Sequence, residues 1–232
     1  MTGVQTCALP ISTATQKANF ANWFSYYRTR INAMKTSAGE AFRVVDNSFR
    51  VGLHTINSPG GTGSTGAFLS LGTFEGTPRT DWYNRFYQQQ PSGNTPLREA
   101  QQRIGEYYKT GASPSGSTVA DPIQYSCQQN YHLLTTDGQW NNTGATGTVG
   151  TTNYDNVLPA TNPDLIPALN AEFGSTFTAG GPWPRPYREK AGTGSVNTLS
   201  DLATYYWSTD LRPTLTNNVF TSSSNPANWQ NM

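Results

Sequence analysis

An amphipathic stripe of large side chains near the start of the chain constrains the fold more than any other feature. Its members follow the three-and-four spacing that places side chains on one face of a helix, and they are Phe20, Trp23, Phe24, Tyr27, Ile31 and Met34. This spacing predicts a helix from Gln16 to about Ala41. Because a helix with one apolar face must bury that face against another element, the chain is expected to form a layered fold.

Strand and helix patterns follow that helix in a definite order. Phe49 to Ile56 is rich in β-formers and bounded by turn residues, which predicts a strand, and Ala67 to Phe74 could pair with it as an edge strand. Thr95 to Lys109 predicts a helix with Pro96 in its first turn. Tyr131 to Leu134 predicts a short buried strand. This order implies an α/β fold, with a layered sheet and helices packed on it.

The last of these strands runs into a Thr-Thr-Asp-Gly turn that contains Asp137. In open α/β sheets ligands bind at the carboxyl ends of strands, and hard divalent cations prefer oxygen ligands. The carboxylate of Asp137 and the hydroxyl of Thr95 are therefore candidate ligands for such a cation. In the alternative interpretation, Asp137 and Gly138 only form a turn, and Thr95 only caps the helix that Pro96 opens.

Five blocks of sequence carry a resemblance to a known family. They are ANFANWFSYYRTRINAMKTSAGEAF (18–42), RVGLHTIN (50–57), TDWYNRFYQQQPSGNTPLREAQQRIGEYY (80–108), CQQNYHLLTTDGQWN (127–141) and NTLSDLATYYWSTDLRPTLTNNV (197–219). In this order they resemble a von Willebrand factor A-type domain, and more closely the N-terminal part of the PilY/PilC family of adhesins associated with type IV pilus tips. The resemblance spans about residues 16–232.

The resemblance implies a Rossmann-like open sheet with flanking helices and a metal-ion-dependent adhesion site for Mg²⁺ or Ca²⁺. It matches Thr95 to the threonine of the family's second metal motif and Asp137 to the aspartate of the third. The first motif, Asp-x-Ser-x-Ser, would lie upstream of about Gln16 and is absent. With two of the three motifs, we expect weak or negligible affinity for the cation.

Residues 2–11, TGVQTCALPI, match what a widely used sequencing adapter encodes in one reading frame. We therefore expect 1–11 to be adapter-derived and 12–232 to be a partial A-type domain that lacks its first strand and one or more C-terminal strands. The alternative is a genuine short N-terminal segment. A sheet without those strands exposes unpaired edges, so the isolated chain is expected to be marginally stable or prone to aggregation.

A long segment from 139 to 196 is rich in Asn, Thr, Gly and Pro and is expected to be a loop insertion near the metal face. Trp183 and Tyr187 could form a recognition surface for a ligand, or could pin the loop to the body of the domain.

Beyond the insertion, Thr198 to Trp207 predicts a helix with a capped start and Asp201 in its first turn. Asp210 and Arg212, at its far end, could form a structural hydrogen-bonded pair.

Composition fits an exported, surface-exposed protein with many loops. Only 12% of the residues are charged, and the chain has 22 glycines and 15 prolines. A net charge of +1 gives no support to binding of nucleic acid or an anionic membrane, and no run reaches the roughly 18 apolar residues of a membrane span. Cys127 is either a small buried residue or the partner of a cysteine beyond this sequence.

Enzymatic alternatives find little support in the residues present. His54 and His132 lie inside predicted strands without metal-ligand spacing, and no nucleophile elbow occurs. A glycosidase would need two converging carboxylates, and no such pairing is evident in the sequence.

The expected function is a non-enzymatic adhesion and assembly module of a type IV pilus tip protein, exported to the bacterial surface. Its expected partners are pilus minor subunits or a host or surface ligand. In the alternative interpretation the chain is a structural component of pilus biogenesis with a vestigial metal site.

Overall fold

The computed structural model of the chain describes residues 13–57, 67–141, 144–151, 153–154, 196–216 and 218–219. The expected adapter segment, 1–11, and most of the expected insertion, including Trp183 and Tyr187, lie outside the described residues.

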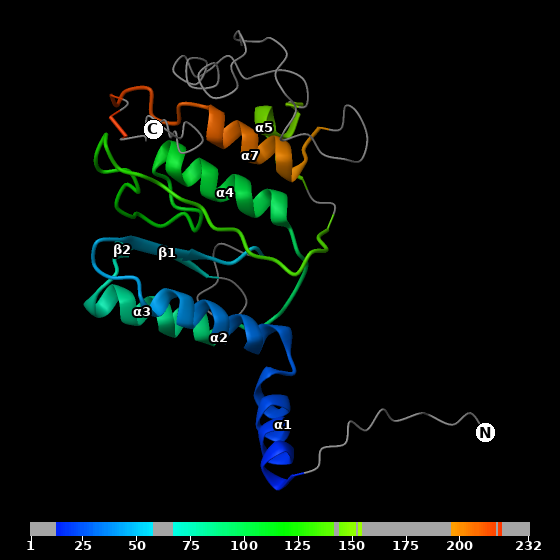
Figure 1. Cartoon of the computed structure of the whole chain (residues 1–232). Coiled ribbons are helices and arrows are strands. Elements are labelled where there is room, and N and C mark those ends of the chain that lie inside the picture. The colour runs from blue at the N-terminus through cyan, green and yellow to red at the C-terminus, as the bar shows by residue number, and fades with distance from the viewer. Residues whose placement is uncertain are drawn as a thin grey trace, which may run out of the picture.

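The described elements form a mixed helix and strand structure in layers. A two-stranded sheet lies between α2 and α3 on one side and α4 on the other, α7 packs on the far side of α4, and α1 projects away from the body (Figure 1). In chain order the elements are α1 (Ala14–Tyr27), α2 (Arg30–Arg43), β1 (Arg50–His54), β2 (Phe68–Thr73), α3 (Gly76–Gln88), α4 (Leu97–Thr110), α5 (Gly147–Thr151) and α7 (Leu199–Ser208).

The sheet confirms the two expected strands and their pairing. β1 and β2 are antiparallel, with Arg50 opposite Thr73 and His54 opposite Phe68, and the register is irregular between Val51 and Leu53. These are the two strands of the only sheet that the described residues form. They agree with the α/β fold class at the coarse level of helices packed on a sheet.

The expected single helix from 16 to 41 is wrong in one respect, because the structure has two helices there. α1 begins with a capping box between Thr13 and Gln16, and the chain then turns at Thr29, whose backbone is extended. α2 packs on the body and buries Lys35 and Gly39, whereas α1 buries no residue. Helix packing therefore accounts for the direction of α2, and across the break the Asn32 side-chain amide of α2 donates to the Tyr26 carbonyl of α1 at 2.9 Å.

Aromatic rings form the core between the sheet and α3. Phe74 and Trp82 are almost completely buried; the Trp82 ring stacks on Phe42 at 4.6 Å and meets Phe74 edge-on at 5.6 Å. The Trp82 indole N–H donates to the carbonyl of Gly52 in β1 at 3.1 Å. α3, a helix missing from the elements expected above, is thus fastened to the sheet by both packing and a hydrogen bond.

The helix expected from 95 to 109 is confirmed as α4, and the one expected from 198 to 207 is confirmed as α7. The α7 cap is reciprocal: the Asp201 N–H donates to the Thr198 hydroxyl at 3.0 Å, and the Thr198 N–H donates to the Asp201 carboxylate at 3.1 Å. That buried carboxylate also accepts from the Tyr154 N–H at 2.8 Å. A cluster packs between α7 and the 145–154 region, formed by Ala145, Val149, Tyr154, Leu202 and Tyr205, with Tyr206 against it.

The buried strand expected at 131–134 is a second error. The segment has no strand structure, and Tyr131 and Leu133 are 67% and 76% exposed. An apolar run becomes a buried strand only beside a neighbouring strand, and no described strand pairs with this one. Cys127 is exposed and free, so of its two interpretations the small buried residue is wrong. No helix among the described residues combines the length and apolar character that crossing a membrane requires.

Candidate functional site

The two loops that carry the candidate metal ligands meet in the structure. The Asn141 N–H donates to the carbonyl of Thr95 at 3.0 Å, and the Thr95 N–H donates back to the side-chain oxygen of Asn141. This reciprocal pair joins positions 46 residues apart in the chain. The turn after Asp137 is therefore held against the loop that precedes α4.

Thr95 lies at the entrance to α4 and is half-buried. Pro96 is the N-cap of this helix, and no side chain caps it. The interpretation of Thr95 as a side-chain cap is therefore wrong.

Asp137 occupies the exposed end of the 131–137 segment. Its carboxylate pairs with the guanidinium of Arg30 at the start of α2, and the two side chains are 51% and 86% exposed. Gly138 follows with a φ of 120°, a backbone conformation that favours glycine in a turn. Since exposed ion pairs contribute at most about 1 kcal/mol, this contact leaves Asp137 accessible to a competing cation.

The residues present supply only part of a cation site. Ca²⁺ takes six to eight oxygen ligands and Mg²⁺ takes six, whereas Thr95 and Asp137 offer one hydroxyl and one carboxylate. Within the described ranges no group of three or more His, Cys, Asp or Glu residues is placed to hold a metal. The donor chemistry suits a hard cation, and water or further oxygen donors would have to complete the coordination shell.

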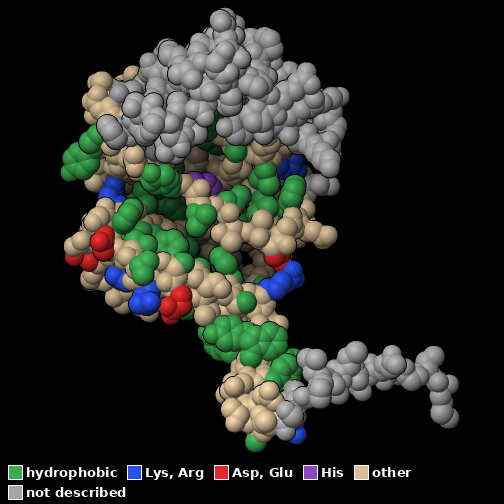
Figure 2. Space-filling model, viewed as in Figure 1, with side chains coloured by type: hydrophobic (Ala, Val, Ile, Leu, Met, Phe, Trp, Pro, Cys, Tyr) green, Lys and Arg blue, Asp and Glu red, His purple; other side chains and the backbone are tan. Residues whose placement is uncertain are grey.

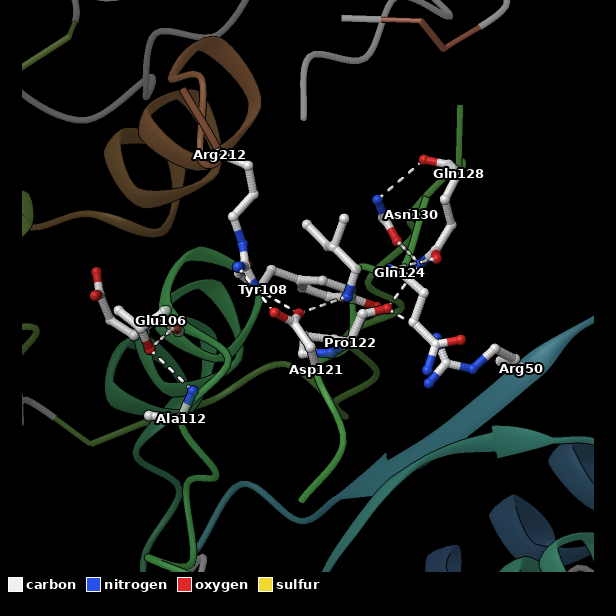
Figure 3. Close-up of polar contacts among 12 residues, drawn as sticks. Arg50, Glu106, Tyr108, Ala112, Asp121, Pro122, Gln124, Gln128, Asn130 and Arg212 are labelled. Carbon is white, nitrogen blue, oxygen red and sulfur yellow. Dashed lines mark hydrogen bonds and ion pairs between the residues drawn. The ribbon is translucent and has the colours of Figure 1, made fainter. Parts of the chain in front are cut away.

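Arg212 hydrogen-bonds Asp210 as expected, and its side chain also anchors the loop leading to Asp137 (Figure 3). The Arg212 guanidinium binds both carboxylate oxygens of Asp121, at 3.0 and 2.6 Å, and donates to the Tyr108 carbonyl at 2.7 Å. Its backbone N–H donates to the Asp210 carboxylate at 2.9 Å. The expected pairing of Asp210 with Arg212 thus survives as a backbone contact, while the side chain fastens the 121–130 loop to α4.

The same loop is tied to the sheet at Pro122 (Figure 3). The Pro122 carbonyl accepts from the Arg50 guanidinium of β1 at 2.9 Å and from the Gln128 amide at 2.8 Å. Gln128 also donates to Asn130 at 2.6 Å. The path from α4 to the Asp137 turn is therefore positioned from both sides, although it contains no regular element.

His54 is a structural residue of the interior, as its place in a predicted strand suggests. One ring nitrogen, Nδ1, lies 3.3 Å from the Ala67 carbonyl, and Nε2 accepts from the Arg103 guanidinium at 3.1 Å. Burial, and secondly the positive charge of Arg103, lower the pKa of His54 to about 4. The ring is therefore neutral at physiological pH and serves to join β1 to α4.

Comparison of the sequence with known proteins identifies the family of the chain. The chain is 34% identical over 247 residues to the type IV pilus biogenesis factor PilY1 of Pseudomonas aeruginosa strain PAK, an alignment that includes 96% of the chain. The chain belongs to the PilY family. PilY1 of strain PAO1 is 33% identical over 94% of the chain, and PilY1 of strain UCBPP-PA14 is 34% identical over 97%.

The chain spans about a fifth of the length of these PilY1 relatives, 19% in each case. No protein-family model matches the chain, and no solved structure does. The relationship therefore assigns the family and leaves the von Willebrand factor A-type fold and the metal site as proposals.

Sequence reasoning missed two residues that shape this part of the PilY chain. Asn141 joins the two candidate loops, and Arg30 neutralises Asp137. Asn141 carried no local signal, because its contact with Thr95 joins positions 46 residues apart. Arg30 carried none either, since its contact spans 107 residues.

Proposed function

We propose that the chain is a non-enzymatic adhesion and assembly module of a type IV pilus protein, exported to the bacterial surface and located at the pilus tip. It binds a partner through a divalent-cation site that includes Thr95 and Asp137. The proposal is supported by kinship with proteins named as type IV pilus biogenesis factors. The observation that carries it is the Thr95–Asn141 pairing, which holds the two candidate ligand loops together.

The proposed cation is Mg²⁺ or Ca²⁺, in an adhesion site on a von Willebrand factor A-like sheet. Asp137 would hold it through a carboxylate oxygen and Thr95 through its hydroxyl, with water or further oxygen donors completing the shell. A bound cation supplies an open coordination position for an acidic group of the partner. The partner is a pilus minor subunit or a ligand on a host or other surface.

Arg30 gives the proposal a specific electrostatic consequence. Its guanidinium balances the Asp137 carboxylate in the cation-free chain, so a divalent cation at this carboxylate must displace it. Because the pair is exposed and its contribution is small, displacement costs little. Removing Arg30 should therefore preserve or strengthen cation binding, whereas removing Asp137 should abolish it.

A second candidate function rests on the same ion pair. If Asp137 serves only to receive Arg30, the metal site is vestigial and the chain is a structural component of pilus biogenesis. In that case Asp137 and Arg30 form one structural contact, and replacing either residue should cause the same defect.

The test compares Asp137→Ala with Arg30→Ala in the full-length protein. Calorimetric titration with Mg²⁺ and Ca²⁺ should give a binding signal in the wild type and in Arg30→Ala, and none in Asp137→Ala. Cells with Asp137→Ala should assemble pili but attach poorly. Equal defects in both variants, or loss of piliation in Asp137→Ala, would instead favour the structural function.

A further inference from the structure

The exposed turn at Asp137 places an aspartate directly before a glycine. This is the sole position in the sequence where glycine follows an aspartate or an asparagine. The Asp137 side chain is 51% exposed, and Gly138 has a φ of 120°, in the region that glycine adopts most readily. Because glycine has no side chain, its backbone nitrogen is the least shielded one that can approach an aspartate carboxyl group. The turn therefore combines the two groups from which a cyclic imide forms.

The Gly138 nitrogen is only weakly held. Its N–H donates to the Thr136 hydroxyl at 3.5 Å, which is at the long limit of a hydrogen bond. The turn contains no helix or strand, so no regular ladder of backbone bonds fixes its dihedral angles. Segments with few backbone hydrogen bonds open at a low cost in free energy. Rotation in this turn can therefore bring the Gly138 nitrogen to the side-chain carboxyl carbon, Cγ, of Asp137.

Two other exposed aspartates lack this combination. The Asp46 carboxylate accepts from the Ser48 N–H at 2.9 Å, and the residue that follows it, Asn47, has a side chain that shields the backbone nitrogen. Asp121 is followed by Pro122, which has no backbone N–H. Asp46 and Asp121 therefore serve as internal references for Asp137.

The guanidinium of Arg30, the first residue of α2, holds the Asp137 carboxylate in an ion pair. Among the ion pairs of the described residues Asp137 occurs with Arg30 alone. Charged side chains are also sparse over the described part of the body in Figure 2. Closing an imide ring must move the carboxyl group out of this contact, because Cγ has to reach Gly138. Arg30 therefore opposes ring closure.

We propose that Asp137–Gly138 is a site of spontaneous aspartate isomerisation, which Arg30 slows. The Gly138 nitrogen bonds to Cγ of Asp137, and its hydrogen and a proton from solvent leave with one carboxylate oxygen as water, which closes a cyclic succinimide. Water then adds to the main-chain carbonyl carbon of Asp137, and the bond from this carbon to the Gly138 nitrogen breaks. The water oxygen stays on that carbon as part of a carboxylate, one hydrogen returns to the nitrogen, and a proton is released. The product is isoaspartate, with no net change in atoms and no oxidation or reduction.

Isomerisation would change the turn in a defined way. In isoaspartate the free carboxylate is attached directly to Cα, so it lies nearer the backbone by one carbon–carbon bond, about 1.5 Å, while the main chain gains one carbon. The contact with Arg30 should then be lost. The path from Asp137 to Asn141, which is hydrogen-bonded to Thr95, should also be displaced. In a consequence that rests on the proposed function, older molecules would lose the carboxylate ligand of the cation.

The test is incubation of the intact chain at neutral pH and physiological temperature, with a chelator that removes divalent cations. Chymotrypsin cleaves after Leu134 and Trp140 and releases the turn as the peptide 135–140. Isoaspartate gives a second chromatographic peak of unchanged mass, which isoaspartyl methyltransferase labels, whereas deamidation of an asparagine changes the mass. This peak should grow with time, while the peptides that contain Asp46 and Asp121 should keep a single form.

Two matched variants test the restraint by Arg30. Arg30→Ala should increase the rate at which the isoaspartate peak grows by about two- to fivefold, the range set by the weak energy of an exposed ion pair. Arg43→Ala removes the exposed contact with Glu40 at the other end of α2 and should age at the wild-type rate. Circular dichroism of each variant checks that the helices are retained.

Three outcomes would overturn the proposal. They are no isoaspartate at Asp137, equal conversion at Asp46, and an unchanged rate in Arg30→Ala. Failure of the proposed cation site would leave the result unaffected, because the incubation contains no free divalent cation.

Discussion

Replacing His54 with glutamine should make the stability of the chain less sensitive to acid. In the native structure Nε2 of His54 accepts a hydrogen bond from Arg103, so the ring must be neutral on that nitrogen. Its other nitrogen faces the carbonyl of Ala67. Glutamine also offers one acceptor and one donor but does not titrate. The substitution therefore removes the protonation while keeping the means to hydrogen-bond both neighbours.

The size of the effect follows from the pKa of His54. Burial and the charge of Arg103 lower this pKa from 6.5 to about 4 in the folded chain. Between these two values the unfolded chain binds more protons, so the stability contributed by the neutral ring is complete above about pH 6.5 and is lost as the pH falls toward 4. At about 1.4 kcal/mol per pKa unit, the free energy of unfolding should fall by about 2.5 kcal/mol between about pH 7.5 and pH 4.5.

Urea unfolding, followed by far-ultraviolet circular dichroism at both pH values, measures this loss. Carboxylates that titrate in the same range affect the wild type and His54→Gln alike, so the difference between the two proteins isolates the histidine. Arg103→Met should show a smaller pH dependence than the wild type, because it removes the second cause of the lowered pKa. An equal loss of stability in the wild type and His54→Gln would refute the reasoning.

Two further pairs of substitutions test the packing around α4. Arg212→Ala removes both bonds to Asp121 and the bond to Tyr108, and should lower the free energy of unfolding in urea by about 2 kcal/mol. Asp121→Asn keeps an acceptor and should lower this free energy by less. Equal losses of stability in the two variants would contradict this account. A methyl group at Gly105 would overlap the ring of Tyr206, so Gly105→Ala should destabilise by about 1–3 kcal/mol in thermal unfolding. In a Tyr206→Ala background the same change should stabilise, because alanine favours helices by up to about 1 kcal/mol over glycine, and the absence of this reversal would disprove the clash.

Elements encoded by local patterns could be predicted from the sequence. β1, β2, α4 and α7 each have an alternating or helical apolar pattern with turn or cap residues at the ends, and the structure contains all four. α3 was missed although Pro78 lies in its first turn and Trp82 and Phe86 are four residues apart. Its apolar face is almost entirely aromatic, a composition that also favours strands.

Features that depend on distant residues could not be predicted. The helix expected from 16 to 41 contains neither glycine nor proline near Thr29, so its break has no local signal. The apolar run at 131–134 predicts a strand only if another strand lies beside it. In the candidate site, Thr95 and Asp137 could be named from their motifs, whereas Asn141 and Arg30 required knowledge of which loops meet. Neither set of residues by itself establishes a cation site.

The position of Trp82 also gives the chain an internal optical reporter. Its indole is 3% exposed, hydrogen-bonded to Gly52 and surrounded by other rings, whereas Trp23 and Trp140 are about half-exposed. A collisional quencher such as acrylamide reaches exposed indoles first, so the quenching-resistant fluorescence that Trp82→Phe removes reports the interface between α3 and the sheet. The wavelength of that emission should shift when α3 separates from the sheet, so no added label is needed to follow this step.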